Sequence, residues 1–232
     1  MVITEQYKII RIKNNIRMEV DDIVVIESHL GILIDGKPIA TLQCSPDSQK
    51  ALVYGYLVSQ RLISSKDHVT DFFFDKEKNQ VLVSLAESAC HKEMIGSNTT
   101  YSLTDVQEVA GKFIPGSDNF RATGALHSAA LCRRNQILIY KEDLSRHCAF
   151  DKMVGEALLS EISMKDCYAI TSGRVPNDMF DKVLAAGIPA IFSRSAPTQA
   201  TVNLARKTNT ILCGFVREGR MNIYSEWDRI KK

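Results

Sequence analysis

Residues 168–215 decide the fold, and they read YAITSGRVPNDMFDKVLAAGIPAIFSRSAPTQATVNLARKTNTILCGF. Three short apolar runs here are predicted strands, and the two segments between them have the period of amphipathic helices. The predicted strands are 168–171, 190–193 and 210–215, and the predicted helices are 177–186 and 198–207. Gly187 follows the first helix, at a position where glycine commonly ends one. Buried strands that alternate with helices predict an α/β fold.

The same alternation extends to both sides of this stretch. We expect helices at 120–131 and 145–160, a strand at 137–140 and a last strand at 221–224. Four strands of the buried type, separated by helices, predict a layered α/β sandwich with a largely parallel sheet.

The N-terminal part of the chain has a different rhythm. We expect strands at 8–12, 23–27, 30–34, 38–42, 69–74 and 80–85, and a helix that Ser45 caps and that runs to about residue 63. Residues 86–103 show no period and are interpreted as a long surface loop. Thr104 and Gln107 then form a predicted capping box. We place a domain boundary at this loop, with a smaller α+β domain at 1–103 and the α/β domain at 104–232.

Composition limits the classes of function. The chain has 232 residues, of which 45% are hydrophobic and 24% charged, with a formal net charge of +2. This near balance gives no strong field for nucleic acid or a membrane surface. No apolar run approaches the roughly 20 residues of a membrane helix, and no signal peptide is visible. We therefore expect a soluble protein of the reducing cytoplasm.

The six cysteines are widely spaced, and no Cys-x-x-Cys pair occurs. This spacing excludes zinc-ribbon, iron–sulfur and thioredoxin-type motifs, so no metal site is expected. Cys132, Cys167 and Cys213 lie in or beside apolar segments and are predicted core residues. Cys148 lies within a predicted helix beside His147. Cys90 differs, because it lies in a polar loop beside His91 and Lys92, which favour the thiolate; alone, such a loop cysteine is more often incidental.

Polar residues follow each predicted strand of the α/β part. Ligands of open α/β sheets bind beyond the carboxyl ends of the strands. These segments hold hydroxyl groups, glycines and arginines, which suit the binding of phosphate groups. Any one of the segments, taken alone, is more simply interpreted as a turn or a helix cap. The candidates are Ser172 and Arg174 after one strand, Ser193, Ser195 and Thr198 after the next, and Phe215, Val216, Arg217, Glu218, Gly219 and Arg220 after the last.

Two histidines are also candidates for chemistry. Asp143, His147 and Asp151 are spaced by four and are expected to share a face, so His147 could be a base or a metal ligand. The favoured reading is a structural histidine. His127 is expected in the first turns of a helix, where zinc deaminases carry His-x-Glu, but Ala129 stands at the glutamate position and no cysteine pair follows. A metal-dependent deaminase is therefore disfavoured.

Together these segments resemble the FdhD family of formate dehydrogenase accessory sulfurtransferases. The stretch 120–129, FRATGALHSA, is similar to the family's Thr-Gly-Gly-x-His-Ala motif, and 142–152, EDLSRHCAFDK, to its Glu-Asp-Val-Gly-Arg-His-Asn-Ala-x-Asp-Lys signature. The segments SGR at 172–174, AGIP at 186–189 and SRSAPT at 193–198 follow in the family's order. The tail from Gly214 to Tyr224 also fits, and the N-terminal half matches more loosely.

The resemblance implies a cytidine deaminase-like three-layer C-terminal domain and a homodimer. It also implies a sulfur relay, in which a cysteine desulfurase loads a persulfide onto Cys90. The sulfur then passes to the molybdenum bis-guanine-dinucleotide cofactor before its insertion into formate dehydrogenase. Cofactor binding is assigned in the family to the tail, here residues 215–220, and His147 of the signature joins the candidate cofactor-binding residues.

The loop departs from the family pattern Cys-Gly-x-Cys-Gly. His91 replaces the first glycine, and Glu93 stands at the second cysteine. Two hypotheses follow. The chain is either a sulfur carrier that works through the single Cys90, or a non-catalytic binder or chaperone of the guanine-dinucleotide cofactor.

Overall fold

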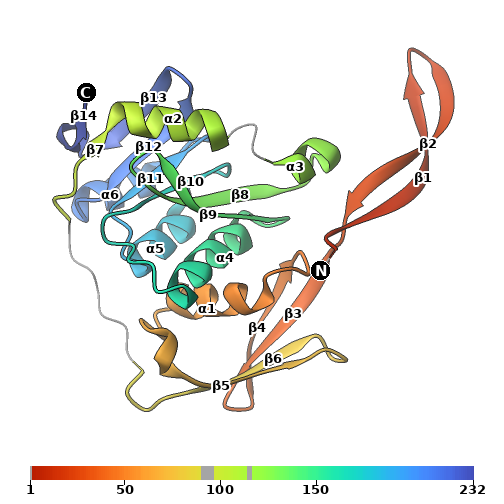
Figure 1. The fold of residues 1–232 in the computed structure, drawn as a ribbon, viewed down its shortest axis with the longest axis horizontal. Coiled ribbons are helices and arrows are strands. Elements are labelled where there is room, and N and C mark those ends of the chain that lie inside the picture. The colour runs from red at the N-terminus through yellow and green to blue at the C-terminus, as the bar shows by residue number, and fades with distance from the viewer. Residues whose placement is uncertain (1, 90–96, 114–116) are drawn as a thin grey trace.

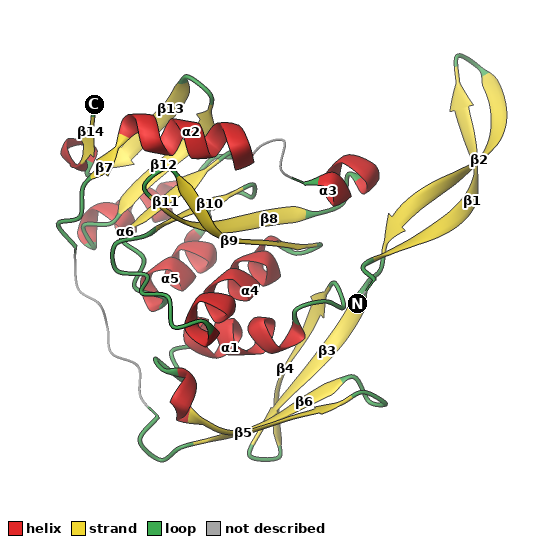
Figure 2. Cartoon of the chain, in the orientation of Figure 1, coloured by secondary structure: helices red, strands yellow, loops and turns green. Residues whose placement is uncertain are grey.

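The fold, obtained as a computed structural model, is a mixed α/β arrangement of stacked layers with one long arm (Figure 1). The structure describes residues 2–89, 97–113 and 117–232. A six-stranded sheet and a four-stranded sheet lie at different levels, with helices between them (Figure 2). Within the described residues, no helix combines the length and apolarity needed to cross a bilayer.

The six-stranded sheet has the strand order β13-β12-β11-β10-β8-β9. Its strands are β8 (His127–Arg133), β9 (Gln136–Asp143), β10 (Tyr168–Thr171), β11 (Ala190–Ser193), β12 (Ile211–Arg217) and β13 (Arg220–Ser225). The prediction of a largely parallel sheet is wrong. The central strands β10, β11 and β12 run parallel, but β8, β9 and β13 pair antiparallel to their neighbours. Tight turns cause this, because a short hairpin can join only antiparallel strands; Arg134 and Gly219 adopt the left-handed conformations that such turns need.

Helices cover both faces of this sheet. On one face lies α2 (Leu103–Phe113), which buries Val106, Val109 and Phe113 against the sheet. The other face is covered by α4 (Arg146–Leu159), α5 (Asn177–Ala185) and α6 (Gln199–Lys207). This part of the chain therefore has three layers; the more specific cytidine deaminase-like description stays a prediction.

The helix expected at 120–131 is wrong in its second half. A short α3 (Asp118–Thr123) ends at Gly124, whose φ of 66° places it in the left-handed region typical of helix ends. The chain then enters β8, and Ala129 and Leu131 are fully buried between the helical layers. Alanine and leucine favour helices locally, but burial in the middle of the sheet overrides that preference. His127 consequently begins a strand and does not lie on a helix.

The N-terminal part forms a four-stranded sheet of order β4-β3-β6-β5. Its strands are β3 (Ser28–Ile34), β4 (Lys37–Cys44), β5 (Val69–Asp75) and β6 (Gln80–Leu85), close to the predicted ones. The helix α1 (Gln49–Ser59) lies between this sheet and α4 (Figure 1). It begins later than predicted, because the Ser45 hydroxyl contacts Asp47 and Asp143 and does not cap the helix.

Glycines let α1 and α4 touch backbone to backbone. A Cβ atom added at Gly55 would lie 1.8 Å from the Asp151 carbonyl oxygen, and one at Gly155 would lie 1.8 Å from that of Ala51. Residues from both helices and both sheets belong to one hydrophobic cluster. The division into domains at 1–103 and 104–232 stays a prediction, but the two parts share this core.

Smaller elements complete the body. They are η1 (Lys66–His68), β7 (Tyr101–Ser102), η2 (Trp227–Arg229) and β14 (Ile230–Lys231), and β14 pairs with β7. The predicted capping box at Thr104 is replaced by a cap from Ser102, whose Oγ accepts a hydrogen bond from the Asp105 amide at 3.3 Å.

The arm is a hairpin of β1 (Thr4–Lys13) and β2 (Ile16–Val25), two strands much longer than the predicted ones. They pair antiparallel over ten positions and form a sheet of their own. Asn14 and Asn15, at φ of 52° and 64°, form the turn. The arm projects away from the body (Figure 1).

Candidate functional site

One edge of the six-stranded sheet gathers the polar segments of interest. The strand β8 pairs antiparallel with both β9 and β10, so β9 runs in the same direction as β10, β11 and β12. All four strands therefore end at this edge. The antiparallel strand β8 begins at the same edge, which places His127 beside the strand ends. The topology thus brings segments that are distant in the sequence to one rim, as expected for an α/β ligand site.

A cleft of about 450 Å³ opens at this rim. Of the predicted residues, Ser172, Ser195 and Arg217 line it. They are joined by His127 and Arg194, which the prediction of the phosphate site did not include. Phe120 from α3, 44% exposed, adds an aromatic side to the cleft. The volume suits a ligand of nucleotide size.

The two serines are held in place by the backbone. Ser172 Oγ accepts a hydrogen bond from the Ser128 amide at 2.9 Å and lies 3.3 Å from His127 Nδ1. Ser195 Oγ donates to the Ser172 carbonyl oxygen at 3.0 Å. The loops after β10 and β11 are therefore tied to each other and to the start of β8. Such preorganised hydroxyl groups can bind a ligand without much loss of entropy.

Two arginines give the cleft its charge. Arg217 Nη1 donates to the Arg194 carbonyl oxygen at 2.7 Å, so the two residues are neighbours. Arg194 Nε is buried and has no hydrogen-bond partner in the described structure. Burial, and then the positive charge of Arg217, lower the pKa of Arg194 from its ordinary value. Two adjacent cations with an unused buried donor form a site for an anionic group.

Other predicted residues support the rim without lining the cleft. Ser193 is fully buried, and its Oγ donates to the Gly173 carbonyl oxygen at 2.7 Å. Thr198 caps α6, where its side chain accepts from the Thr201 amide. Arg174 is exposed and is not among the residues that line the cleft.

The predicted tail is divided in the same way. Phe215 has a φ of 54°, is 37% exposed and bulges from β12, whereas Val216 is fully buried in the core. Glu218 and Gly219 form the exposed turn between β12 and β13, and the exposed Arg220 begins β13. Among the six predicted tail residues, Arg217 alone belongs to the cleft lining.

His147 lies in a neighbouring hollow, on α4. Its Nε2 is 3.7 Å from Asp178 Oδ2. Burial, and then the Arg146 guanidinium, lower the pKa of His147. The expectation that His147 shares a helix face with Asp143 is wrong, because Asp143 ends β9.

Both aspartates near His147 are buried and paired with lysines. Asp143 Oδ2 lies 2.7 Å from Lys152 Nζ, and both side chains are fully buried. Asp151 Oδ2 lies 2.6 Å from Lys182 Nζ, while its Oδ1 accepts from Ser59 at 2.6 Å. These charges hold α4 against its neighbours, and none is free to act on a ligand.

The described cysteines are all buried thiols: Cys44, Cys132, Cys148, Cys167 and Cys213. Burial raises the pKa of Cys44 and of Cys148 to about 12, and it raises the pKa of the other three as well. All five therefore stay protonated at neutral pH and are poor nucleophiles. Cys90, the predicted sulfur carrier, lies outside the described residues.

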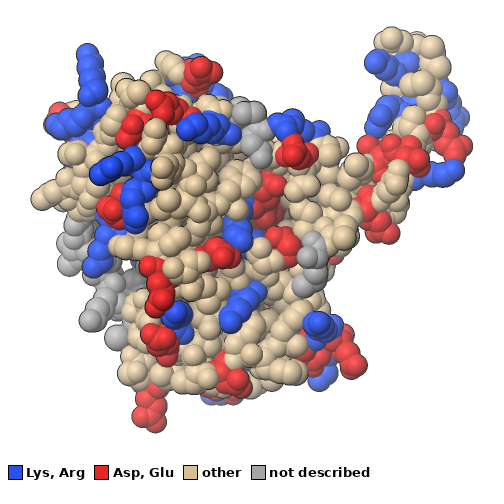
Figure 3. Space-filling model, viewed as in Figure 1, with Lys and Arg blue, Asp and Glu red and all other residues tan. Residues whose placement is uncertain are grey.

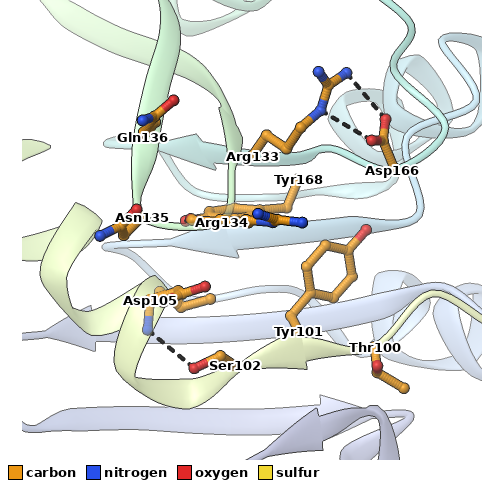
Figure 4. Close-up of a pocket in the computed structure, with 11 residues that line it drawn as sticks. Thr100, Tyr101, Ser102, Asp105, Arg133, Arg134, Asn135, Gln136, Asp166 and Tyr168 are labelled. Carbon is orange, nitrogen blue, oxygen red and sulfur yellow. Dashed lines mark hydrogen bonds and ion pairs between the residues drawn. The ribbon is translucent and has the colours of Figure 1, made fainter.

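A second hollow, of about 500 Å³, opens at the opposite edge of the sheet (Figure 4). It also contains arginines, Arg133 and Arg134. The Arg133 guanidinium, however, lies 2.9 Å from Asp166 Oδ2, so its charge is already matched within the protein. The cleft at Arg194 is therefore the better candidate for an anionic ligand.

Metal ligands do not gather in the described structure: no group of three or more His, Cys, Asp or Glu residues is arranged to hold a metal ion there. Beside His127, β8 continues with Ser128 and Ala129. Neither side chain can replace the carboxylate that shuttles protons in zinc deaminases.

Comparison with known proteins gives the relationship. Residues 25–103 and 86–231 match the FdhD/NarQ family. A sulfur carrier protein FdhD of Bacillus licheniformis is 30% identical over 99% of this chain and 98% of its own, and that of Bacillus pumilus is 31% identical over 90% of each. A crystal structure from Desulfotalea psychrophila, described as a formate dehydrogenase accessory protein, superposes with a TM-score of 0.86 at 23% identity, covering 99% of this chain and all of that one. The chain belongs to the FdhD/NarQ family.

Proposed function

We propose that this protein is a sulfur carrier for formate dehydrogenase. It would accept sulfur from a cysteine desulfurase on Cys90 and deliver it to the molybdenum bis-guanine-dinucleotide cofactor. Relatives that match almost the whole chain carry the name sulfur carrier protein FdhD, which supports the role. The molybdenum cofactor is cargo in this proposal.

The cleft arginines are the observation that carries the proposal. Arg194 holds a buried Nε without a partner beside the cation of Arg217. A diphosphate of the guanine dinucleotide would supply the missing acceptors and neutralise both cations. The Ser172 hydroxyl would donate to one of its remaining oxygens, and Phe120 offers a surface on which a base can stack.

Cys90 is the sulfur carrier in this proposal because the other five cysteines are poor nucleophiles. Five of the six cysteines are buried, with raised pKa values that suppress the thiolate. In the transfer, the Cys90 thiolate attacks the terminal sulfur of the desulfurase persulfide. The S–S bond of the donor breaks, its cysteine leaves as a thiolate, and Cys90 becomes the persulfide. That terminal sulfur is then available to the cofactor in the cleft.

An intact-mass experiment tests the sulfur transfer. The protein is incubated with a cysteine desulfurase and cysteine, and we expect a reductant-sensitive adduct of one sulfur atom on Cys90. Cys90→Ala should abolish the adduct, whereas Cys213→Ala, which removes a buried thiol, should keep it. An adduct that persists in Cys90→Ala, or no adduct in the unchanged protein, would contradict the role of Cys90.

The alternative is a cofactor binder that does not transfer sulfur. It is favoured by Glu93, which stands where the family pattern has its second cysteine. Titration with guanosine diphosphate tests the binding that both proposals require, and the mass experiment separates the two. Both proposals predict binding that survives Cys90→Ala and weakens in Arg217→Ala, but only the first predicts the sulfur adduct.

The expected setting follows from the same proposal. The partners would be the desulfurase, formate dehydrogenase and a second copy of this chain. Unpaired thiols suit the reducing cytoplasm, which is where we expect sulfur transfer to occur.

A further inference from the structure

Glu142 is a half-buried carboxylate beside the rim cleft, and no cation matches it within the described residues. It lies on β9 directly opposite Ser128 of β8, so both side chains point to the same face of the sheet. Ser128 lines the cleft, and its Oγ lies 3.4 Å from Glu142 Oε1. The next residue along the chain, Asp143, is by contrast paired with Lys152. In Figure 3, acidic side chains reach the surface beside α3, where β8 begins and β9 ends.

The hydrogen bonds to Glu142 come from neutral groups and leave room for more. Asn119 Nδ2 donates to Oε2 at 3.2 Å, and the Tyr140 hydroxyl lies 3.2 Å from Oε1. The same hydroxyl donates to Ser128 Oγ at 3.0 Å, so the two hydroxyl groups can form one chain that ends at Oε1. A carboxylate offers about four acceptor positions, two on each oxygen. With one bond on each oxygen, Glu142 can accept two further donors side by side.

The rim therefore has a positive end and a negative end. In the strand order, β9 with Glu142 is three strands away from β11, which Arg194 follows. At about 4.8 Å per strand, these two positions are about 14 Å apart, a span close to that of an extended nucleoside diphosphate. Phe120, the neighbour of Asn119 on α3, lines the cleft. A nucleotide with its phosphates at the arginines would thus bring its base to the Glu142 end.

Guanine has the hydrogen-bonding pattern that this carboxylate can select. Its pairing edge presents two adjacent donors, N1–H and the N2 amine, which match the two oxygens of one carboxylate. Adenine has an acceptor at N1, which would face the lone pairs of Glu142. Xanthine keeps N1–H but has an acceptor oxygen at position 2. A site built to accept two hydrogen bonds rejects a base that cannot supply them, because its acceptors are then left unpaired.

We propose that Glu142 is the residue that selects guanine, by accepting hydrogen bonds from N1–H and the N2 amine of a nucleotide whose phosphates lie at Arg194 and Arg217. The inference rests on the proposed function and adds to it the group that recognises the base. Asn119 and Tyr140 are positioning residues, because they hold the carboxylate in place. The charge of Glu142 also repels phosphate, so it sets the direction in which the nucleotide lies along the rim.

A reversal of base preference tests the inference by calorimetric titration. The unchanged protein should bind guanosine diphosphate at least about tenfold more tightly than xanthosine or adenosine diphosphate. Glu142→Gln replaces one acceptor by a donor of the same shape, which complements N1–H and the oxygen of xanthine. This variant should bind xanthosine diphosphate at least about tenfold more tightly than guanosine diphosphate. A residue that only supported α3 would change the affinity for both nucleotides alike.

The matched control is Glu218→Gln, which removes a negative charge from the exposed turn next to Arg217. It should keep the preference for guanosine diphosphate. The inference is overturned, and cofactor binding stands, if Glu142→Gln keeps that preference or weakens both nucleotides equally. Equal affinity of the unchanged protein for the guanosine and adenosine compounds overturns it without any variant. An unchanged protein that binds no guanosine diphosphate contradicts the proposed cofactor binding itself, and this inference fails with it.

Discussion

Two sets of charged side chains in this protein differ in whether each cation has an anionic partner. Around α4, Lys152 lies 2.7 Å from Asp143 and Lys182 lies 2.6 Å from Asp151, so each of these two lysines has its anion. At the rim cleft, Arg194 has a buried donor with no partner and a second arginine beside it. Matched charges hold the layers together. The unmatched ones indicate where an anionic ligand belongs. Sequence alone does not separate the two sets, because both lie in segments that resemble the same family.

The largest expected effect comes from breaking a matched pair. Lys152→Met leaves Asp143 buried without its cation and should lower the free energy of unfolding by about 3–5 kcal/mol. Urea unfolding followed by circular dichroism measures it. The control is Lys141→Met, which removes a more exposed ion pair with Glu156 and should cost at most about 1 kcal/mol. Equal losses in the two variants would show that burial does not set the cost.

At the cleft the same kind of change should affect binding and spare stability. Arg194→Met keeps the aliphatic stem but removes the unmatched charge. We expect affinity for guanosine diphosphate to fall about ten- to a hundredfold, as for a lost charge-assisted hydrogen bond, with no loss in the free energy of unfolding. Calorimetric titration and urea unfolding measure the two quantities. Arg174→Met, outside the cleft, is the control and should bind normally. If the variant were destabilised but bound guanosine diphosphate with normal affinity, the role of Arg194 would be structural and the prediction would be wrong.

The opposite edge of the sheet gives a smaller effect. Arg133→Met removes a guanidinium that Asp166 already matches at a partly exposed position. The free energy of unfolding should change by less than about 1 kcal/mol. Guanosine diphosphate affinity should not change. If the variant lost nucleotide binding, the ligand would belong to the hollow of Figure 4 and not to the rim.

The histidines near the rim give the smallest effect, as a pH dependence. Burial, and then Arg146, lower the pKa values of His127 and His147 below the ordinary 6.5. As pH falls below 6.5, the unfolded chain therefore takes up protons before the folded one, and the free energy of unfolding falls until the folded pKa values are reached. Replacing both by glutamine should flatten this part of the profile between about pH 7 and pH 5. An unchanged slope would assign the dependence to other groups.

The strands and the helix between residues 168 and 193 were predicted well, because local residues mark where each element begins and ends. The strands at 168–171 and 190–193 and the helix that stops before Gly187 are bounded by residues that punctuate secondary structure. The misreading of β8 arose because Ala129, Ala130 and Leu131 favour a helix when burial between two layers is not visible. Gly124, which ends α3, was the signal that could have corrected it.

The candidate site was predicted in part for a similar reason. The order of segments indicated the rim, and it placed Ser172, Ser195 and Arg217 there. Arg194 was passed over, although it stands between two predicted residues. Its importance comes from its buried, unpartnered Nε and from the neighbouring cation of Arg217, and a linear sequence does not contain that information. The turn residues around Gly219 looked equivalent to Arg217 for the same reason.

The contact of Gly55 with Gly155 has a consequence for modularity. Each glycine leaves just enough room for the backbone of the other helix, so neither helix surface is complete without its counterpart. A fragment cut between residues 103 and 104 would expose a flat apolar strip on both pieces. The two parts of the chain should therefore fold only together, even where they are counted as two domains.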